Sequence, residues 1–243
     1  MNKKKFASLI DPKFSEGIAH RGLHNEKFTE NGLKAFQNAI DHDIAFEFDI
    51  HLTKDKELLV CHDADLVRTT GKAGKIEELS LKEIRDNYKL LDGGVVPTLQ
   101  EVIDLNHDQV PMAIELKVVE KNYKELSKAF RPYLKQFKDK KRVMLISFDP
   151  RSLWPLKKEG FPRSFLHTSE YRPAWLFRGT IESIDIELAY LKEKPKYRYA
   201  KRHYTNVWTI ENLKDLDDVK DVIDTITFQH IDVDEVRKYL KNK

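Results

Sequence analysis

Four short motifs in the first half of the chain carry side chains that could do chemistry together. They are His20-Arg21-Gly22, Glu47-Phe48-Asp49, His62-Asp63 and Glu115-Leu116-Lys117. Each motif follows or ends a short apolar run of the kind that forms a β-strand. The motifs supply histidines for proton transfer, carboxylates that bind hard cations, and cationic side chains that bind anionic oxygens. That inventory suits the metal-assisted cleavage of a phosphodiester.

The acidic side chains of Glu47, Asp49 and Glu115 form a candidate metal site. Glu47 and Asp49 are two residues apart in the strand-like run 44–50, so they share one face of that strand. Carboxylates gathered in one place repel one another unless a cation lies between them, and oxygen ligands favour Mg²⁺, Ca²⁺ or Mn²⁺ over Zn²⁺. His51 shares the same face, but we interpret it as a histidine in the loop beyond the site.

The two histidines of the motifs are candidates for proton transfer. Breaking a phosphodiester requires a base for the attacking hydroxyl and an acid for the leaving alkoxide, and His20 and His62 suit those roles. Arg21 and Lys117 are candidates for holding the phosphate oxygens, and a guanidinium can do so through two parallel hydrogen bonds. Trp208 is a candidate wall of the same pocket, although an aromatic residue on a strand also fits a plain core.

Strand-like and helix-like segments alternate along the whole chain and must position these residues. About eight strand-type runs recur at intervals of roughly 30 residues, the length of one βα unit. Repeated βα units imply a parallel sheet, and eight of them close into a barrel. The length of 243 residues also matches a TIM (β/α)₈ barrel, so we predict one α/β domain over residues 1–243. The predicted strands are 18–20, 44–50, 58–61, 110–116, 143–148, 164–167, 184–188, 206–210 and 225–228.

Residues 63–98 break this rhythm. The segment contains Arg68-Thr69-Thr70-Gly71, a predicted helix near 79–85 and a turn at Asp92-Gly93-Gly94. We interpret it as a small insertion between the second and third core strands, lying over the mouth of the barrel. Outside it, the hydrophobic spacing predicts further helices around 213–219 and 233–240. Pro132 is expected to kink or split the helix that begins near Tyr123.

The composition narrows the classes of partner. Lys and Arg number 43 against 40 Asp and Glu, a net charge of +3, which is a weak argument for nucleic acid. The basic stretch 192–203 could bind nucleic acid or anionic lipid, but a solvated basic helix fits it better. No apolar run is long enough for a membrane span or a secretory signal, so we expect no membrane insertion and a cytoplasmic location. The single cysteine, Cys61, is expected to be buried and inert.

Together, the order and spacing of these motifs resemble those of the glycerophosphodiester phosphodiesterase family. The resemblance is detailed from residue 18 to about 117 and looser through Trp208 to the end. It implies a TIM barrel with a small insertion, a divalent metal ion at the three acidic residues, and His20 and His62 as the acid–base pair. It also implies hydrolysis of a small-molecule glycerophosphodiester to glycerol 3-phosphate and an alcohol.

In the family, the substrate's own glycerol 2-hydroxyl attacks first and gives a cyclic phosphate, which water then opens. The shared elements also include Glu30-Asn31, Leu52-Thr53-Lys54-Asp55, Leu66-x-Arg68-Thr69-Thr70-Gly71 and Pro97-Thr98-Leu99.

Two departures from the family pattern concern substrate choice more than chemistry. Gly32 follows Glu30-Asn31 where the family usually has threonine, and residues 224–228 replace a late Asp-Gly … Thr-Asp pattern. Two alternative functions therefore remain beside the main one. The chain could be a lysophospholipase D-type lipid phosphodiesterase, or a non-catalytic barrel that only binds phosphorylated ligands. The second alternative is disfavoured because a pure binder needs no proton carriers.

Overall fold

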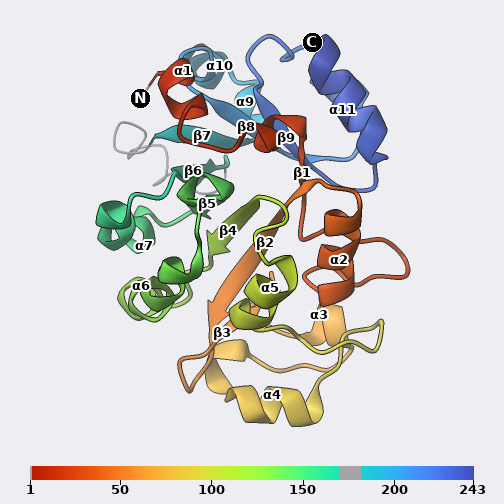
Figure 1. Ribbon diagram of the computed structural model, residues 1–243, viewed down its shortest axis with the longest axis vertical. Helices are drawn as coiled ribbons and strands as arrows, with labels where there is room; N and C mark the ends of the chain where they lie inside the picture. Colours follow the sequence, from red (N-terminus) through yellow and green to blue (C-terminus); the bar gives the residue numbers. More distant parts are fainter. Residues whose placement is uncertain (1, 170–181) are drawn as a thin grey trace.

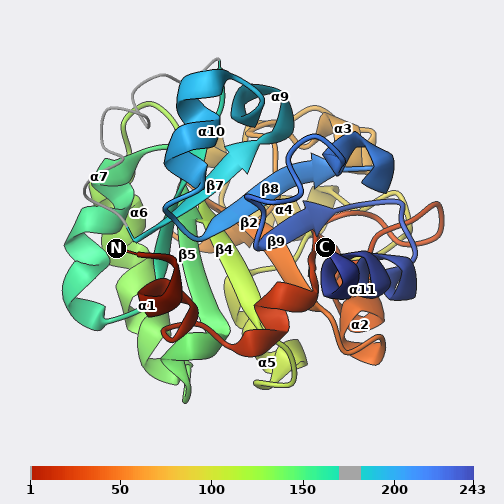
Figure 2. The same ribbon diagram turned by 90° about the horizontal axis from the view of Figure 1, so that it is seen from above.

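The chain folds into a closed barrel of parallel strands surrounded by helices, in a computed structural model that describes residues 2–169 and 182–243 (Figure 1, Figure 2). The barrel strands follow the order β1-β2-β4-β5-β6-β7-β8-β9, and β9 pairs with β1 to close the ring. This arrangement confirms the predicted (β/α)₈ fold. The barrel strands are β1 (Ile18–Ala19), β2 (Ala45–Leu52), β4 (Met112–Leu116), β5 (Val143–Ser147), β6 (Arg163–His167), β7 (Ser183–Glu187), β8 (Thr205–Ile210) and β9 (Thr225–Phe228).

Strand β2 shows how the alternation of side chains separates the core from the site. Phe46 and Phe48 point outward to the helices, where the ring of Phe46 stacks on Phe36 of helix α2 (Leu33–Asp41) at a centroid distance of 4.8 Å. Successive side chains of a strand point to opposite faces, so Glu47 and Asp49 point into the barrel. The main hydrophobic core therefore lies between strands and helices, and the barrel interior is left for polar groups at its carboxyl end.

An apolar plug fills the amino-terminal end of the barrel. Helix α1 (Lys3–Ala7) and the 3₁₀ turn Pro12–Glu16 place Phe6 and Phe14 there, and both side chains are fully buried. They belong to one cluster with Ala45 and other residues near the amino ends of the strands. The sequence pattern predicted no element in this segment. Because the plug fills the amino-terminal end, a pocket can form at the carboxyl end of the barrel. TIM barrels carry their active sites at that end.

The segment between the second and third barrel strands builds a small core of its own. Strand β3 (Leu58–Val60) pairs antiparallel with the end of β2, and helices α3 (Val67–Thr70) and α4 (Leu81–Asn87) follow. Figure 1 shows β3, α3 and α4 at the same end of the molecule, opposite the end that carries α1 and α11. The side chains of this second core are Leu59, Cys61, Leu66, Ile76, Ile84, Tyr88, Leu90 and Val96. That residues 63–98 form a distinct insertion over the mouth stays a prediction.

The remaining helices agree with the prediction at some positions and differ from it at others. Helix α6 (Tyr123–Phe130) ends before Pro132 and a 3₁₀ turn continues from it, as expected for proline. The helix predicted around 213–219 is wrong, because only a 3₁₀ turn forms at Leu213–Leu216. Asp217 and Asp218 follow it, and aspartate favours turns over helix interiors. The other helices are α5 (Leu99–Asn106), α7 (Pro150–Leu153), α9 (Leu188–Leu191), α10 (Lys194–Ala200) and α11 (Val233–Asn242).

Helix lengths bear on the membrane prediction. Within residues 2–169 and 182–243, no helix combines the length and the apolar character that crossing a membrane would require.

Candidate active site

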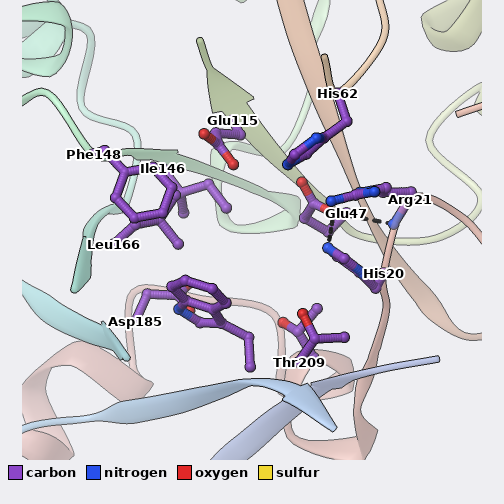
Figure 3. Close-up of a pocket in the computed structure, with 12 residues that line it drawn as sticks. His20, Arg21, Glu47, His62, Glu115, Ile146, Phe148, Leu166, Asp185 and Thr209 are labelled. Carbon is purple, nitrogen blue, oxygen red and sulfur yellow. Dashed lines mark hydrogen bonds and ion pairs between the residues drawn. The ribbon is translucent and has the colours of Figure 1, made fainter. Parts of the chain in front are cut away.

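A pocket opens at the carboxyl end of the barrel and has two unlike sides. Figure 3 shows His20, Arg21, Glu47, His62 and Glu115 along one side. Across the pocket lie three apolar side chains, Ile146, Phe148 and Leu166. The charged side can hold an anionic group and a cation, whereas the apolar side can only contact the uncharged part of a ligand.

The three predicted acidic residues converge on the charged side. Strands β2 and β4 pair so that Asp49 lies directly opposite Glu115, and Glu47 is two residues earlier on the same face. One ligand oxygen from each carboxylate lies within 4.8 Å of the others, and all three residues are buried. The Oδ1 atom of Asp49 is buried and accepts no hydrogen bond. A buried, unsatisfied carboxylate oxygen inside an acidic cluster fits a hard divalent cation.

Lys117 partly compensates the negative charge of this cluster. Its Nζ lies 3.0 Å from Glu115 Oε1 and 3.4 Å from Asp49 Oδ1, and Asn31 donates a 2.9 Å hydrogen bond to Asp49 Oδ2. Although burial opposes it, Lys117, His62 and Arg21 hold the pKa of Asp49 well below its usual range.

Compensation of the other two carboxylates is incomplete. Burial raises the pKa of Glu115 to about 7 despite the neighbouring Lys117. Burial, with repulsion from Asp49 and Glu115, also raises the pKa of Glu47. Protons therefore occupy part of this cluster near neutral pH, and a bound cation would displace them.

The loop after β1 is folded tightly against the cluster. Arg21 has a left-handed backbone (φ 54°), which lets its amide N–H donate a 3.0 Å hydrogen bond to Glu47 Oε2. Gly22 also has a positive φ of 80°, and a Cβ there would meet Phe36 at 2.9 Å. Glycine is the residue that tolerates both conditions, which explains its place after His20-Arg21. The arginine side chain turns to Glu30, donating from Nη1 to Oε1 at 2.8 Å.

His20 is held by a residue from the far end of the chain. Its Nδ1 lies 2.7 Å from Oε1 of Gln229, and its Nε2 lies 4.0 Å from Glu47 Oε2. Because an amide oxygen can only accept, Nδ1 carries the proton and Nε2 is left as the basic nitrogen. Burial and the charge of Arg21 lower the pKa of His20 to about 4. The ring is therefore neutral at physiological pH and able to accept a proton.

His62 faces the same pocket but has a charged partner. Its Nδ1 donates to Oδ1 of Asp63 at 2.6 Å, which leaves Nε2 without the proton. Burial lowers the pKa of His62, and the hydrogen bond to Asp63 acts in the opposite direction. The two histidines are thus oriented alike, one by a neutral amide and the other by a carboxylate. A carboxylate partner stabilises an imidazolium, whereas an amide contributes no charge.

Other residues singled out in the sequence have clear positions. Trp208 lines the pocket, with its ring 5.7 Å from that of Phe148. His51 lies in β2 rather than in a loop and is buried, with Nδ1 2.8 Å from Glu77 Oε1 and Nε2 3.1 Å from the His62 carbonyl oxygen, outside the acidic cluster. Cys61 is buried, as expected, and burial raises its thiol pKa to about 12, which disfavours the reactive thiolate.

Asp185, which lines the pocket, was missed in the sequence, and so were Gln229 and Asn206, which hydrogen-bond to residues of its lining. Gln229 and Asp185 stand in no recognisable motif, and Asn206 donates hydrogen bonds of 2.6 Å to Asp185 Oδ1 and 2.9 Å to Thr227 Oγ1. The inward face of the predicted strand 184–188 was the one signal for Asp185. His167 is buried at the end of β6, where a strand is covered on both faces.

The fold and the site together define a TIM barrel whose carboxyl-end pocket pairs a buried acidic cluster with two histidines. Residues 20–196 match the glycerophosphoryl diester phosphodiesterase family. The chain belongs to this family.

Curated relatives and solved structures agree with this assignment. A glycerophosphodiester phosphodiesterase of Caldanaerobacter subterraneus subsp. tengcongensis is 33% identical over 58% of this chain and 61% of its own length. A relative of the same name from Bacillus altitudinis is 30% identical over 56% of this chain and 59% of its own length. The chain thus spans about 60% of the length of these relatives.

The structural comparison extends over nearly the whole chain. A glycerophosphodiester phosphodiesterase of Thermotoga maritima has a TM-score of 0.73 at 25% identity, covering 93% of this chain and 97% of its own. An Oleispira antarctica phosphodiesterase, solved in complex with the product sn-glycerol-3-phosphate, has a TM-score of 0.77 at 22% identity, covering 97% and 98%. The second likeness concerns the fold alone.

Proposed function

We propose that this protein is a metal-dependent phosphodiesterase that hydrolyses glycerophosphodiesters to glycerol 3-phosphate and an alcohol. The observation that carries the proposal is the convergence of Glu47, Asp49 and Glu115 within 4.8 Å beside two oriented histidines. The relatives that share this family are named for the same activity, and a structural neighbour binds glycerol 3-phosphate as its product.

Glu47, Asp49 and Glu115 would hold the divalent ion, which we expect to be Mg²⁺, Ca²⁺ or Mn²⁺. When bound, such an ion polarises a phosphoryl oxygen and stabilises the charge that develops on it. Arg21 and Lys117 lie beside the same cluster and bind the remaining phosphate oxygens. Trp208 and the apolar side of the pocket contact the uncharged part of the substrate and exclude water from it.

The two histidines then divide the proton transfers between them. His20, neutral and with its basic Nε2 facing the acidic side, takes the proton of the attacking hydroxyl. His62, whose protonated form is stabilised by Asp63, gives a proton to the leaving alkoxide. When water opens the cyclic phosphate that the first step forms, the same two groups act in the reverse direction.

The main test is turnover with and without metal. Purified protein is assayed for glycerol 3-phosphate released from glycerophosphocholine. Chelation with EDTA should abolish the activity, and one of Mg²⁺, Ca²⁺ or Mn²⁺ should restore it. Full activity in chelator would refute the metal role, and tight phosphate binding without turnover at any divalent ion would favour the non-catalytic alternative.

A second candidate function is that of a lysophospholipase D. The apolar side formed by Ile146, Phe148 and Leu166 favours it, and a lysophospholipase D of Mus musculus is 32% identical over 51% of this chain and 42% of its own length. Faster turnover of detergent-dispersed lysolipid than of glycerophosphocholine would support this reading. The reverse order of rates would support the soluble substrate.

Two broader expectations remain part of this proposal. The basic stretch 192–203, which includes α10, is expected to be solvated rather than to bind nucleic acid. A cytoplasmic location is also expected, and the single cysteine is compatible with a reducing compartment.

A further inference from the structure

Arg68, on helix α3 of the segment 63–98, bridges two carboxylates that belong to different loops. Its Nε donates to Asp63 Oδ2 at 2.6 Å, while Nη1 and Nη2 donate to Glu30 Oε2 and Oε1 at 2.6 and 2.9 Å. The planar guanidinium thus contacts both carboxylates at once and binds that of Glu30 through two parallel hydrogen bonds. An ammonium group could not reproduce this forked geometry.

Each of these carboxylates also holds a side chain of the pocket. The second oxygen of Asp63 accepts the hydrogen bond that orients His62, at 2.6 Å. Oε1 of Glu30 also accepts from Arg21 Nη1 at 2.8 Å. The result is a continuous chain of hydrogen bonds from a pocket histidine to a pocket arginine, with Arg68 at its centre.

We propose that Arg68 is a positioning residue that aligns His62 and Arg21 for the same reacting phosphate. This inference rests on the proposed function. Arg68 does not itself line the pocket, so it acts through Asp63 and Glu30. Arg68 thereby fixes the distance and angle between His62, which transfers a proton, and Arg21, which binds the phosphate. These two residues come from different loops.

A purely stabilising role fits the surroundings of Arg68 less well. The side chains of Arg68 and Asp63 are 43% and 36% exposed, whereas that of Glu30 is 14% exposed. Exposed ion pairs such as that between Arg68 and Asp63 contribute little to stability. The segment 63–98 is held by its own buried core, which includes Leu66 and Ile84. The network contacts two residues of the pocket, His62 and Arg21. Alignment of these two side chains therefore explains it better than a contribution to the stability of the fold.

The test compares Arg68→Ala with a matched control. Arg85 also lies in the segment 63–98 and pairs with a carboxylate outside it, Glu101, but Glu101 contacts no pocket residue. We expect Arg68→Ala to lower kcat/KM by up to about 10²-fold, because small misplacements of catalytic groups have effects of that size. Arg85→Ala should keep the activity of the wild type, and both variants should unfold at similar temperatures. Equal activities of the two variants would overturn the proposal.

Two further measurements separate alignment from a loss of structure. Free guanidinium ion should restore activity to Arg68→Ala and not change Arg85→Ala. Arg68→Lys should keep the fold but not the activity, since lysine lacks the fork. Full activity in Arg68→Lys would contradict the proposed geometry. The same holds if Arg68→Ala is not rescued at any guanidinium concentration that leaves the wild type active.

A spectroscopic readout keeps this test independent of turnover. In ¹⁵N NMR spectra, His62 should show a proton on Nδ1 in the wild type and a mixture of tautomers in Arg68→Ala. An unchanged tautomer in Arg68→Ala would reject the inference. A wild-type protein that shows the expected tautomer but hydrolyses no glycerophosphodiester would instead reject the proposed function.

Discussion

At the scale of single residues, the two pocket histidines differ in one respect, the charge of the partner at Nδ1. His62 has the carboxylate of Asp63 and His20 has the amide of Gln229. The same kind of ring, oriented in the same way, is therefore biased toward a proton donor in one case and a proton acceptor in the other. Under the proposed function, this difference would make His62 the proton donor and His20 the proton acceptor without any change in the rings themselves.

His20→Ala and His62→Ala should each lower kcat on glycerophosphocholine by about 10²-fold or more, the usual scale for a lost general acid or base. A substrate whose leaving group needs no proton, such as a 4-nitrophenyl diester, separates the two roles. On that substrate His62→Ala should regain most of the rate of 4-nitrophenol release, which reports the first step alone, because only the general acid is dispensable there, whereas His20→Ala should not. Recovery of His20→Ala instead would reverse the assignment.

The acidic cluster leads to a prediction about pH. In the ion-free protein the pKa of Glu115 is raised to about 7, so below that pH an incoming cation must displace a proton. The affinity for a divalent ion should therefore rise as pH increases through about 7. Titration calorimetry on either side of this pH measures the change, and Glu115→Gln should flatten it. An affinity that is constant across this range would contradict the shifted pKa.

At the scale of elements, the structure separates what local pattern can predict from what it cannot. Strands β4 and β5 appear within two residues of the predicted runs, because each consists mostly of apolar residues. The predicted helix at 213–219 failed because a short apolar spacing does not outweigh the turn preference of the following aspartates. Helix α5 had no predicted counterpart, although its capping box at Thr98 and Glu101 was visible in the sequence.

The segment 63–98 should unfold separately from the barrel if its core is independent. Ile84 is fully buried in that core, so Ile84→Ala should cost about 2–5 kcal/mol of local stability. Hydrogen exchange should then speed up in residues 63–98 and stay slow in β5. Ile226→Ala, in the barrel strand β9, is the control that should speed exchange in the barrel. Equal acceleration of both regions by Ile84→Ala would argue against a separate insertion.

At the scale of the whole molecule, the barrel brings distant parts of the chain together at one end. His20 and Gln229 are separated by 209 positions in sequence and lie 2.7 Å apart. The apolar plug around Phe6 and Phe14 fills the opposite end. The pocket is therefore a property of the closed ring, and no fragment of the chain contains all of it.

A divalent ion that binds the acidic cluster should stabilise the whole protein. An ion that binds only the folded state adds about 2.7 kcal/mol at a concentration 100-fold above its Kd. Thermal unfolding followed by calorimetry should give a higher Tm with the activating ion and a return to the original Tm with EDTA. Asp49→Asn, which removes one candidate ligand, should lose most of this shift. If no divalent ion changes the Tm, the three carboxylates do not bind a metal ion and instead share protons.

The sequence by itself determined which chemical groups the protein has and on which strands they stand. That was possible because the two-residue alternation of strands and the spacing of motifs are local, and Glu47, Asp49 and Glu115 could be placed from them. Only the tertiary structure decided the partners of those groups: Gln229 behind His20, Arg68 between Asp63 and Glu30, and Asp185 across the pocket. These contacts depend on closure of the barrel and on loops whose direction no local pattern specifies.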